Sequence, residues 1–280
     1  MQDLKSILQR HGFHFKKQFG QNFISDANLL ESIVTASGID ENTTVVEIGC
    51  GAGTLTRALA ERAKKVYAYD VDTALQPVLA ETLAGLENVE VIFRDFTKVN
   101  LPQLDEEIGE FTVVANLPYY ITTPLITKLL EESEKVQGIS IMVQEEVAER
   151  FCAKENTAEY GSITAAIALK GSAKIVKRVS RNLFYPRPNV DSAVVKITFE
   201  RGRIAVKSEK AYRTTVKCAF LNRRKTLENN LVNFFGLTRD EAKSVLAEAG
   251  VEEKARGETL SPQRLAILSD ILLDRGIIKE

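Results

Sequence analysis

The stretch TVVEIGCGAGT (44–54) decides the fold. Its apolar first half, residues 44–48, predicts a short buried strand, and the glycine-rich half predicts a turn leading into a helix over 54–63. Glycine lets a backbone take positive φ angles and approach a ligand closely, so this is a nucleotide-binding arrangement. It is not the dinucleotide fingerprint, because that pattern would place a third glycine where Thr54 stands.

Strands and helices alternate around this turn. The expected strands are 65–69, 89–93, 111–115, 139–143, about 173–179 and 192–199, and the expected helices are 26–37, 73–83 and 144–152. This alternation predicts an α/β fold with a doubly wound, Rossmann-like parallel sheet, which the last two strands complete as a hairpin.

After Gly202 the spacing of apolar residues no longer predicts strands and instead predicts helices throughout. The expected helices are 209–221, 226–235, 239–249 and 262–275. We therefore expect a basic N-terminal arm at 1–24, an α/β domain at 25–202 and a small all-helical C-terminal domain at 203–280.

The net charge of −1, from 37 Lys+Arg and 38 Asp+Glu, hides an uneven distribution. Residues 1–24 carry +3, residues 25–171 carry −13, residues 172–228 carry +11 and residues 229–280 carry −2. Clustered basic residues supply the phosphate contacts that dominate nucleic-acid affinity. The two basic segments therefore favour the nucleic-acid partner that the near-zero total argues against.

The composition argues against a metal-binding, secreted or membrane protein. The three cysteines are widely separated, and His11 and His14 have no third ligand nearby, so we expect no metal. The same cysteine usage predicts a reduced, cytoplasmic compartment. No apolar run reaches the roughly 18 residues that a membrane span needs, and the N-terminus lacks the apolar core of a signal peptide.

The glycine turn fits a different nucleotide-binding motif. The spacing Glu47-x-Gly49-x-Gly51-x-Gly53 resembles motif I of class I S-adenosylmethionine-dependent methyltransferases. That cofactor contains no pyrophosphate, and its amino-acid half packs against the glycine backbone. We therefore expect these four residues to contribute to a cofactor site.

Two carboxylates end the next two expected strands. Asp70 stands 21 residues after Gly49, where a carboxylate can accept both hydroxyls of a ribose. Asp95 ends the third strand, where it can accept from an adenine amine while Phe96 walls the ring. Carboxyl ends of parallel strands meet at one edge of a sheet, so the glycine turn, Asp70 and Asp95 are predicted to share one site.

The fourth strand runs into Asn116-Leu117-Pro118-Tyr119, which resembles the element of methyltransferases that modify exocyclic amines of bases. The lone pair of an aromatic amine is delocalised into the ring. Acceptors on its two N–H bonds, the Asn116 side-chain oxygen and the Leu117 carbonyl, favour a pyramidal nitrogen that directs the lone pair at the methyl group. Pro118 fixes the turn, and Tyr119 offers a face on which the base stacks. Catalysis is then mainly positioning and electrostatics, without a dedicated strong base.

Over almost its full length the chain resembles the rRNA adenine dimethyltransferase family, specifically the bacterial small-subunit enzymes. The segments that carry the resemblance are KKQFGQNFI (16–24), VEIGCGAGTLT (46–56), NLPYYITTP (116–124), QEEVAERF (144–151), YGSITA (160–165), LFYPRPNVDSAVV (183–195), FLNRRKTLENNL (220–231) and ETLSPQRLAILSDIL (258–272). The resemblance implies transfer of methyl groups from S-adenosyl-L-methionine to two adjacent adenosines near the 3' end of 16S rRNA, two on each exocyclic amine.

The resemblance also assigns residues. Positions that match the family's cofactor contacts are Asn22, Ile24, Gly49, Asp70, Asp95 and Asn116. Many relatives carry Glu where this chain has Asp70. Phe184, in a Phe-x-Pro-x-Pro element, is expected to sandwich the target adenine opposite Tyr119, although most phenylalanines are core residues.

The implied partner is 16S rRNA in the 30S subunit or its precursor, bound by a monomer. The foremost candidates for rRNA contacts are Lys16, Lys17, Arg187, Arg223, Arg224 and Lys225, the last three opening the second C-terminal helix. Arg178, Arg181 and Lys217 are further candidates.

Two alternatives stay open at this point. One is a macrolide-resistance methyltransferase acting on 23S rRNA, although such relatives usually carry NIPY and differ in the C-terminal domain. The other is a mainly non-catalytic ribosome-assembly factor, against which the intact Glu47, Asn116 and Tyr119 argue.

Overall fold

The structure is a computed structural model that describes residues 4–16, 21–24, 26–200 and 202–279. By its internal contacts the chain divides into two compact units. An α/β unit comprises Met1–Ala148 and Lys174–Thr198, and a helical unit comprises Glu149–Ala173 and Phe199–Glu280. By these contacts residues 149–173 belong with the helical unit, whereas the sequence analysis places them within residues 25–202.

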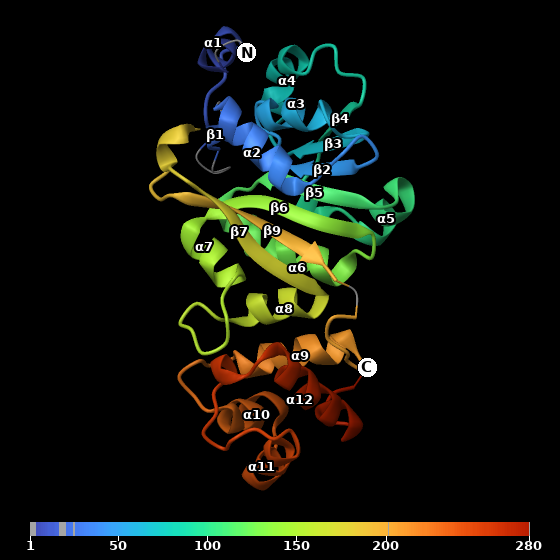
Figure 1. The fold of residues 1–280 in the computed structure, drawn as a ribbon, viewed down its shortest axis with the longest axis vertical. Helices are drawn as coiled ribbons and strands as arrows, with labels where there is room; N and C mark the ends of the chain where they lie inside the picture. The colour runs from blue at the N-terminus through green and yellow to red at the C-terminus, as the bar shows by residue number, and fades with distance from the viewer. Residues whose placement is uncertain (1–3, 17–20, 25, 201, 280) are drawn as a thin grey trace. The chain divides into compact units, whose positions relative to one another are not determined.

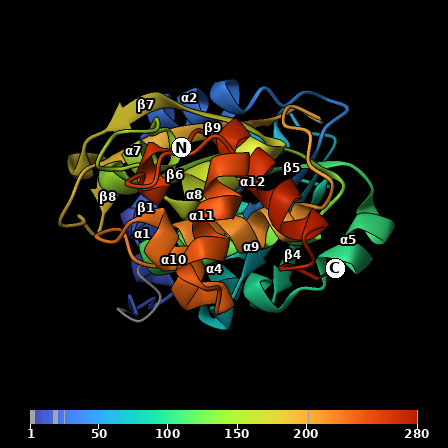
Figure 2. The same cartoon turned by 90° about the horizontal axis from the view of Figure 1, so that it is seen from below.

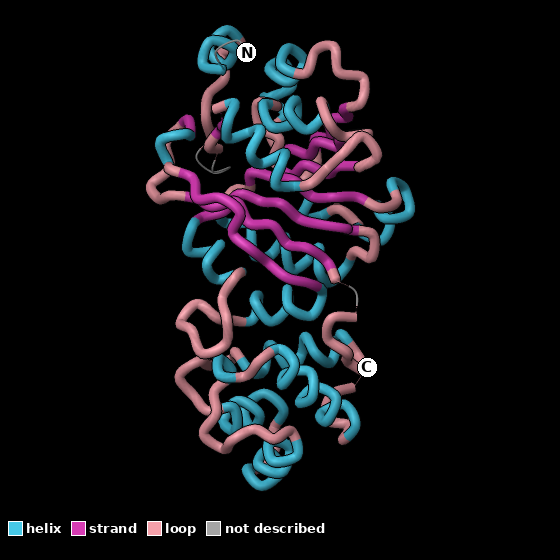
Figure 3. Tube along the Cα trace, viewed as in Figure 1, coloured by secondary structure: helices cyan, strands magenta, loops and turns pink. Residues whose placement is uncertain are grey.

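The sheet is built from β2 (Thr44–Ile48), β3 (Lys65–Asp70), β4 (Val89–Phe93), β5 (Phe111–Asn116), β6 (Val136–Gln144), β7 (Gly171–Val179) and β9 (Ser192–Phe199). Within the described residues these seven strands lie in the order β4-β3-β2-β5-β6-β9-β7 (Figures 1 and 3). Strands β2 to β6 pair in parallel, and β9 pairs antiparallel to β6. The predicted α/β class with a mainly parallel sheet is confirmed, and β7 and β9 are neighbours as expected.

The helices of the α/β unit are α2 (Ala27–Ser37), α3 (Thr54–Ala60), α4 (Gln76–Thr82), α5 (Leu101–Ile108) and α6 (Thr122–Glu132). Figure 1 shows α2 and α3 over one face of the sheet and α6 over the other. Helix α2 begins at Asp26, whose side chain accepts from the Leu29 N–H at 2.7 Å, and ends at Gly38 in the left-handed conformation.

In the α/β unit, α3 and α4 differ from the predicted helices by more than one residue. Helix α3 ends at Ala60 rather than at residue 63, since the chain turns there to enter β3 and the Lys64 N–H donates to the Thr43 carbonyl at 3.0 Å. The expected helix 73–83 is a 3-10 turn, Thr73–Leu75, continued by α4, whose first turn contains Pro77. Proline favours a helix's first turn because its missing N–H is not needed there.

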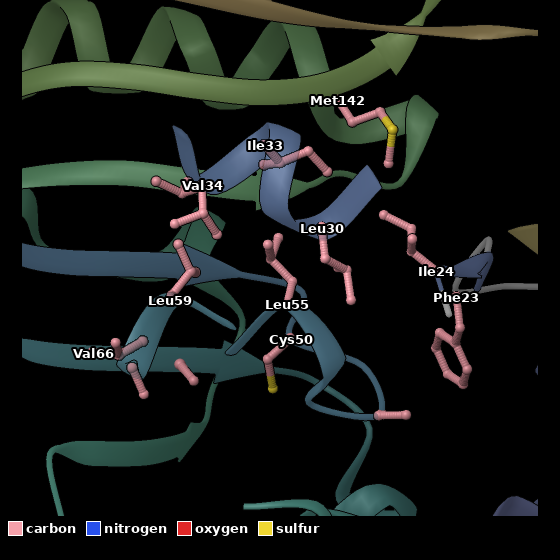
Figure 4. Close-up of a cluster of buried hydrophobic side chains, with 14 of the residues drawn as sticks. Phe23, Ile24, Leu30, Ile33, Val34, Cys50, Leu55, Leu59, Val66 and Met142 are labelled. Carbon is pink, nitrogen blue, oxygen red and sulfur yellow. The ribbon is translucent and has the colours of Figure 1, made fainter. Parts of the chain in front are cut away.

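The core of the α/β unit lies where α2 and α3 meet the sheet. Figure 4 shows Leu30 and Ile33 of α2 beside Leu55 of α3, with Val66 of β3 and Met142 of β6 around them. Each of these side chains is 3% exposed or less. Burial of this apolar surface fixes β2 and α3, and therefore the glycine turn between them.

The N-terminal segment contains elements that the sequence analysis did not predict. Helix α1 (Leu4–Arg10) buries Leu4, Ile7 and Leu8. Strand β1 (Phe23–Ile24) pairs antiparallel with β8 (Phe184–Tyr185) in a separate two-stranded sheet. Both elements therefore contribute buried side chains to the core of the α/β unit.

The helical unit contains α8 (Ser162–Lys170), α9 (Glu209–Ala219), α10 (Leu227–Phe235), α11 (Arg239–Glu248) and α12 (Pro262–Asp274), while α7 (Glu145–Phe151) crosses the boundary between the units. Figure 2 shows α9 to α12 from below. The expectation that Arg223, Arg224 and Lys225 open a helix is wrong. Thr226 caps α10 by accepting from the Asn229 N–H, so the three basic residues lie in the preceding turn.

Candidate active site

A cavity of about 550 Å³ opens at the carboxyl ends of β2 and β5. These neighbouring strands lead to opposite halves of the sheet, and a crevice at such a switch point is where open α/β sheets bind ligands. The predicted site residues that line it are Asn22, Gly49, Gly51, Asp70, Asp95, Asn116, Leu117, Pro118 and Tyr119. Asn22 and Asn116, which are 94 positions apart in the sequence, thus line the same cavity.

The glycine turn forms the floor of this cavity. The N–H groups of Gly49 and Cys50 donate to the Tyr69 carbonyl at 2.8 and 3.1 Å, which ties the turn to β3. Gly51 has a φ of +55°, and a Cβ there would lie 2.8 Å from the Phe23 ring. Glycine at position 51 is therefore required both by the backbone angle and by the close approach of the N-terminal segment.

Asp70, at the end of β3, is buried and held by backbone donors. Its Oδ2 accepts from the Gly51 N–H at 2.8 Å, and its Oδ1 accepts from the Asp72 N–H at 2.9 Å. Burial raises the pKa of this carboxyl, while the backbone hydrogen bonds oppose the shift. Each carboxylate oxygen keeps a further lone pair, so Asp70 can still accept from a ligand hydroxyl.

The side chain of Asp95, which follows β4, is more exposed to solvent than that of Asp70. Its Oδ1 accepts from the N–H and hydroxyl of Thr97 at 3.0 and 2.7 Å, and the hydroxyl contact is the main reason that its pKa is lowered. Phe96 beside it is buried against Tyr69, with ring centroids 4.9 Å apart. The pair provides an acceptor and an apolar wall, as an adenine ring requires.

Asn116 ends β5 with a defined amide orientation. Its Nδ2 donates to the backbone carbonyl of Asn22 at 2.8 Å. The amide nitrogen is thereby engaged by the N-terminal segment, which leaves Oδ1 as the acceptor on the cavity side. This is the arrangement that the amine-positioning hypothesis needs.

Tyr119 is anchored through its hydroxyl. The phenol oxygen and the Ser192 Oγ are 3.0 Å apart, and Ser192 is fully buried on β9. Burial raises the pKa of Tyr119, so the phenol stays neutral. A ring held at its far end is fixed as a stacking surface, whereas Tyr120 beside it is 62% exposed.

Glu47 stands behind the glycine turn and does not line the cavity. It is 1% exposed, and its Oε2 has no hydrogen-bond partner within the described residues. Burial raises its pKa to about 8, and the charge of Asp70 adds to the effect. The buried carboxyl is therefore largely protonated at pH 7.

Three other predicted residues also lie outside the cavity lining. Gly53 is the N-cap of α3. Ile24 and Phe184 pair across the β1–β8 sheet, and both belong to the buried core of the α/β unit. The structure therefore does not bring Phe184, which is 5% exposed, to the surface of the cavity, and its adenine-stacking role stays a prediction.

Several cavity residues were not singled out from the sequence. Gln21 and Phe23 flank Asn22 in the segment KKQFGQNFI, so the signal was adjacent. Arg94, Thr97 and Tyr120 carry no pattern of their own that distinguishes them from ordinary loop residues.

The predicted rRNA-contact residues are distributed over both units. Arg187 is exposed in the α/β unit, and Arg223, Arg224 and Lys225 are exposed in the helical unit, where Arg223 donates to the Ala158 carbonyl at 2.8 Å. The Nζ of Lys16 lies 2.6 Å from Asp72. Lys17 lies outside the described residues.

The described residues add two further findings. They contain no group of three or more His, Cys, Asp or Glu side chains that could hold a metal ion. None of their helices has the length and hydropathy that crossing a bilayer requires.

The strand order and the cavity at the switch point define a class I S-adenosylmethionine-dependent methyltransferase fold. Two solved structures are similar to it. A dimethyladenosine transferase from Plasmodium falciparum matches with a TM-score of 0.79 and 25% identity, covering 91% of this chain and 98% of its own. The 23S rRNA methyltransferase ErmE matches with a TM-score of 0.69 and 27% identity, covering 90% of this chain and 99% of its own.

The family follows from the sequence comparisons. Residues 12–268 match the family model described as ribosomal RNA adenine dimethylase. Proteins named ribosomal RNA small subunit methyltransferase A are 45% identical to this chain in Bacillus licheniformis, over 276 residues, and in Geobacillus thermodenitrificans, over 278 residues. Each alignment covers 96% of this chain and 94% of the relative. The chain belongs to the ribosomal RNA adenine dimethylase family, which confirms the resemblance seen in its motifs.

The cavity fits the S-adenosyl-L-methionine that this family uses. Its volume is in the range of small-molecule sites. Gly49 and Gly51 line the cavity, and Gly49 has a φ of +74°, which residues with a side chain rarely adopt. Acceptors at Asp70 and Asp95 stand on neighbouring strand ends, as a ribose and an adenine amine require.

Proposed function

We propose that this protein transfers methyl groups from S-adenosyl-L-methionine to the exocyclic amines of two adjacent adenosines near the 3' end of 16S rRNA, two on each, in the 30S subunit or its precursor. The observation that carries the proposal is the Asn116 amide, whose nitrogen is engaged by the Asn22 carbonyl at 2.8 Å. Family membership and the names of the relatives at 45% identity support the choice of small-subunit rRNA.

In this proposal the chain positions the target amine. One N–H of the amine donates to the Asn116 Oδ1 and the other to the Leu117 carbonyl, so the nitrogen becomes pyramidal and its lone pair becomes available. The Tyr119 ring, tethered to Ser192, stacks on the base. The methylated amine is cationic and releases its proton afterwards, so no strong base is needed.

The cofactor half of the site is held by the other strand ends. The backbone at Gly49 and Gly51 receives the amino-acid half, Asp70 accepts from the ribose hydroxyls and Asp95 accepts from the adenine amine. When bound, S-adenosyl-L-methionine supplies an electrophilic methyl group on its sulfonium. Asp70 is shorter than the Glu of many relatives, and its two backbone donors support it as a fixed acceptor.

We assign rRNA binding to Arg187, Arg223, Arg224 and Lys225, with Lys16 and Lys17 as candidates in the N-terminal segment. The first four are exposed, as residues that reach phosphates must be. The assignment treats the protein as a cytoplasmic monomer with a methyltransferase domain at 25–202 and an rRNA-binding domain at 203–280.

The 23S rRNA alternative is supported by the similarity to ErmE. The identity to ErmE is 27%, against 45% for relatives named for the small subunit. A drug-susceptibility assay separates the two: cells that express this chain should stay sensitive to macrolides, and acquired resistance would favour the 23S substrate.

Primer extension tests the proposal directly. In a bacterial strain that lacks its own 16S adenine dimethyltransferase, expression of this chain should create reverse-transcription stops at two adjacent adenosines near the rRNA 3' end. Expression of an Asn116→Ala variant at the same level should create none. Unchanged read-through with the unaltered chain would refute the proposed substrate.

A further inference from the structure

A buried carboxylate beside the cavity has partners from the N-terminal segment. Asp72 is 2% exposed and lies two residues beyond Asp70. Its Oδ1 is 2.6 Å from the Nζ of Lys16, and its Oδ2 accepts from the Nε2 of Gln21 at 2.9 Å. Its Oδ1 also accepts from the Ala74 N–H at 3.2 Å, as a cap of the 3-10 turn at Thr73–Leu75.

A capping role alone does not explain this arrangement. A cap needs one side-chain acceptor, and a buried charge is costly unless it is paired. Burial acts to raise the pKa of Asp72, but the hydrogen bonds from Lys16, Gln21 and the Ala74 N–H, together with the charge of Lys16, hold the pKa below its usual range. Asp72 is therefore a charged anchor for both residues.

The Gln21 side chain contacts both Lys16 and Asp72. Its Oε1 accepts from the backbone N–H of Lys16 at 3.1 Å while its Nε2 donates to Asp72, so one side chain links the Lys16 backbone to the carboxylate. The next residue, Asn22, presents the carbonyl that receives the Asn116 amide. Gln21, Asn22 and Phe23 all line the cavity.

Asp72 is joined to the cofactor side as well. Its backbone N–H donates to Asp70 Oδ1 at 2.9 Å, and the other oxygen of Asp70 accepts from Gly51. The Phe23 ring lies against Gly51. A displacement of the N-terminal segment would therefore disturb the cavity wall at Phe23 and the amide of Asn116 together.

We propose that Asp72 is a positioning residue that binds Lys16 and Gln21, so that Gln21, Asn22 and Phe23 stay in the wall of the cofactor cavity and the Asn22 carbonyl orients Asn116. The part of this inference that concerns Asn116 rests on the proposed function, whereas the part that concerns cofactor binding does not. It also gives Lys16 a role that differs from the rRNA contact expected from its charge.

The test compares Asp72→Asn with Lys16→Met. Asparagine keeps the size and the capping oxygen, and Lys16→Met removes the ammonium without touching the cavity lining. The affinity for S-adenosylhomocysteine is measured by calorimetry, and kcat and the affinity for 30S subunits are measured separately. Each variant should bind S-adenosylhomocysteine about tenfold more weakly and show a lower kcat, because a hydrogen-bonded charge is lost. The double variant should be no worse than Asp72→Asn alone, because Lys16→Met then removes only a partner of a carboxylate that is already absent.

Asp40→Asn is the matched control. Asp40 also accepts from the backbone N–H two residues further on, at 3.1 Å, but lies in an exposed turn between α2 and β2. It should leave cofactor affinity unchanged. If Lys16→Met weakens only 30S binding, or if Asp72→Asn and Lys16→Met weaken cofactor binding additively, the proposal is overturned.

An exchange of partners provides an independent check. Gln21→Glu places a carboxylate against Asp72 and should weaken cofactor binding more than either variant above. Adding Asp72→Asn restores a donor opposite the new acceptor and should recover at least part of the affinity. Failure to recover any would contradict the pairing. Inactivity of the unaltered protein on 30S subunits would refute the proposed function instead, while leaving the cofactor result intact.

Discussion

Replacing Glu47 with glutamine should stabilise the protein, and the gain should grow with pH. The carboxyl lies on β2 at 1% exposure, and one of its oxygens has no partner within the described residues. Burial raises its pKa from an ordinary 4.5 to about 8. Glutamine has almost the same shape and does not ionise, so the substitution removes the titration and keeps the packing.

The sign and size follow from proton linkage. Between pH 4.5 and 8 the folded protein keeps a proton that the unfolded chain has released, so the free energy of unfolding falls as the pH rises. Each pH unit within this window lowers the free energy of unfolding by about 1.4 kcal/mol. Between pH 5.5 and pH 7.5 the free energy of unfolding of the unaltered protein should therefore fall by about 3 kcal/mol more than that of the Glu47→Gln variant.

Urea unfolding without cofactor, followed by circular dichroism at pH 5.5 and 7.5, measures this difference. The control is Glu61→Gln, at an exposed position directly after α3, which should shift stability equally at both pH values. If the stability gained by Glu47→Gln is the same at both pH values, or is larger at pH 5.5, the reasoning about the buried carboxyl is wrong.

Three further predictions concern the site and its partner. Asn116→Ala should lower methylation about a hundredfold or more with little change in rRNA binding, and a variant with full turnover would contradict the amine-positioning argument. Arg223→Glu combined with Arg224→Glu should weaken 30S binding and reduce its salt dependence, measured by filter binding at several ionic strengths; unchanged affinity would remove the turn before α10 from the interface. Gly51→Ala should weaken S-adenosylhomocysteine binding in calorimetry, because its Cβ would lie 2.8 Å from the Phe23 ring at a φ of +55°. Binding at full affinity would show that the turn tolerates a side chain.

The parts of the fold that sequence predicted well are those with strong local patterns. The run from Thr44 to Ile48 is apolar and meets glycine at once, so both β2 and the turn were predictable. Helix α10 was predictable from Thr226 and Gly236, which stand at its two ends as caps. Parallel strand order then places the glycine turn beside Asn116 without further information.

Several of the missed elements lack such patterns, although α5, which Asn100 and Gly109 cap, was missed despite having one. Strands β1 and β8 have two residues each, too few for any period to show. Helix α8 buries Ile163, Ala165 and Ile167, so it has no simple apolar stripe. The contacts of Asp72 with Lys16 and Gln21 join residues 56 and 51 positions apart, and only the folded chain brings them together.

Dimethylation of adenosine amines in small-subunit rRNA can be measured as a count of methyl groups. Purified protein and S-adenosyl-L-methionine are incubated with 30S subunits from a strain without the modification, and the rRNA 3' end is analysed by mass spectrometry. Two methyl groups are expected on each of two adjacent adenosines, and transfer by the Asn116→Ala variant is expected to be about a hundredfold slower or more. Methylation only elsewhere in the 16S rRNA, or no methyl transfer by the unaltered protein, would contradict the proposed function.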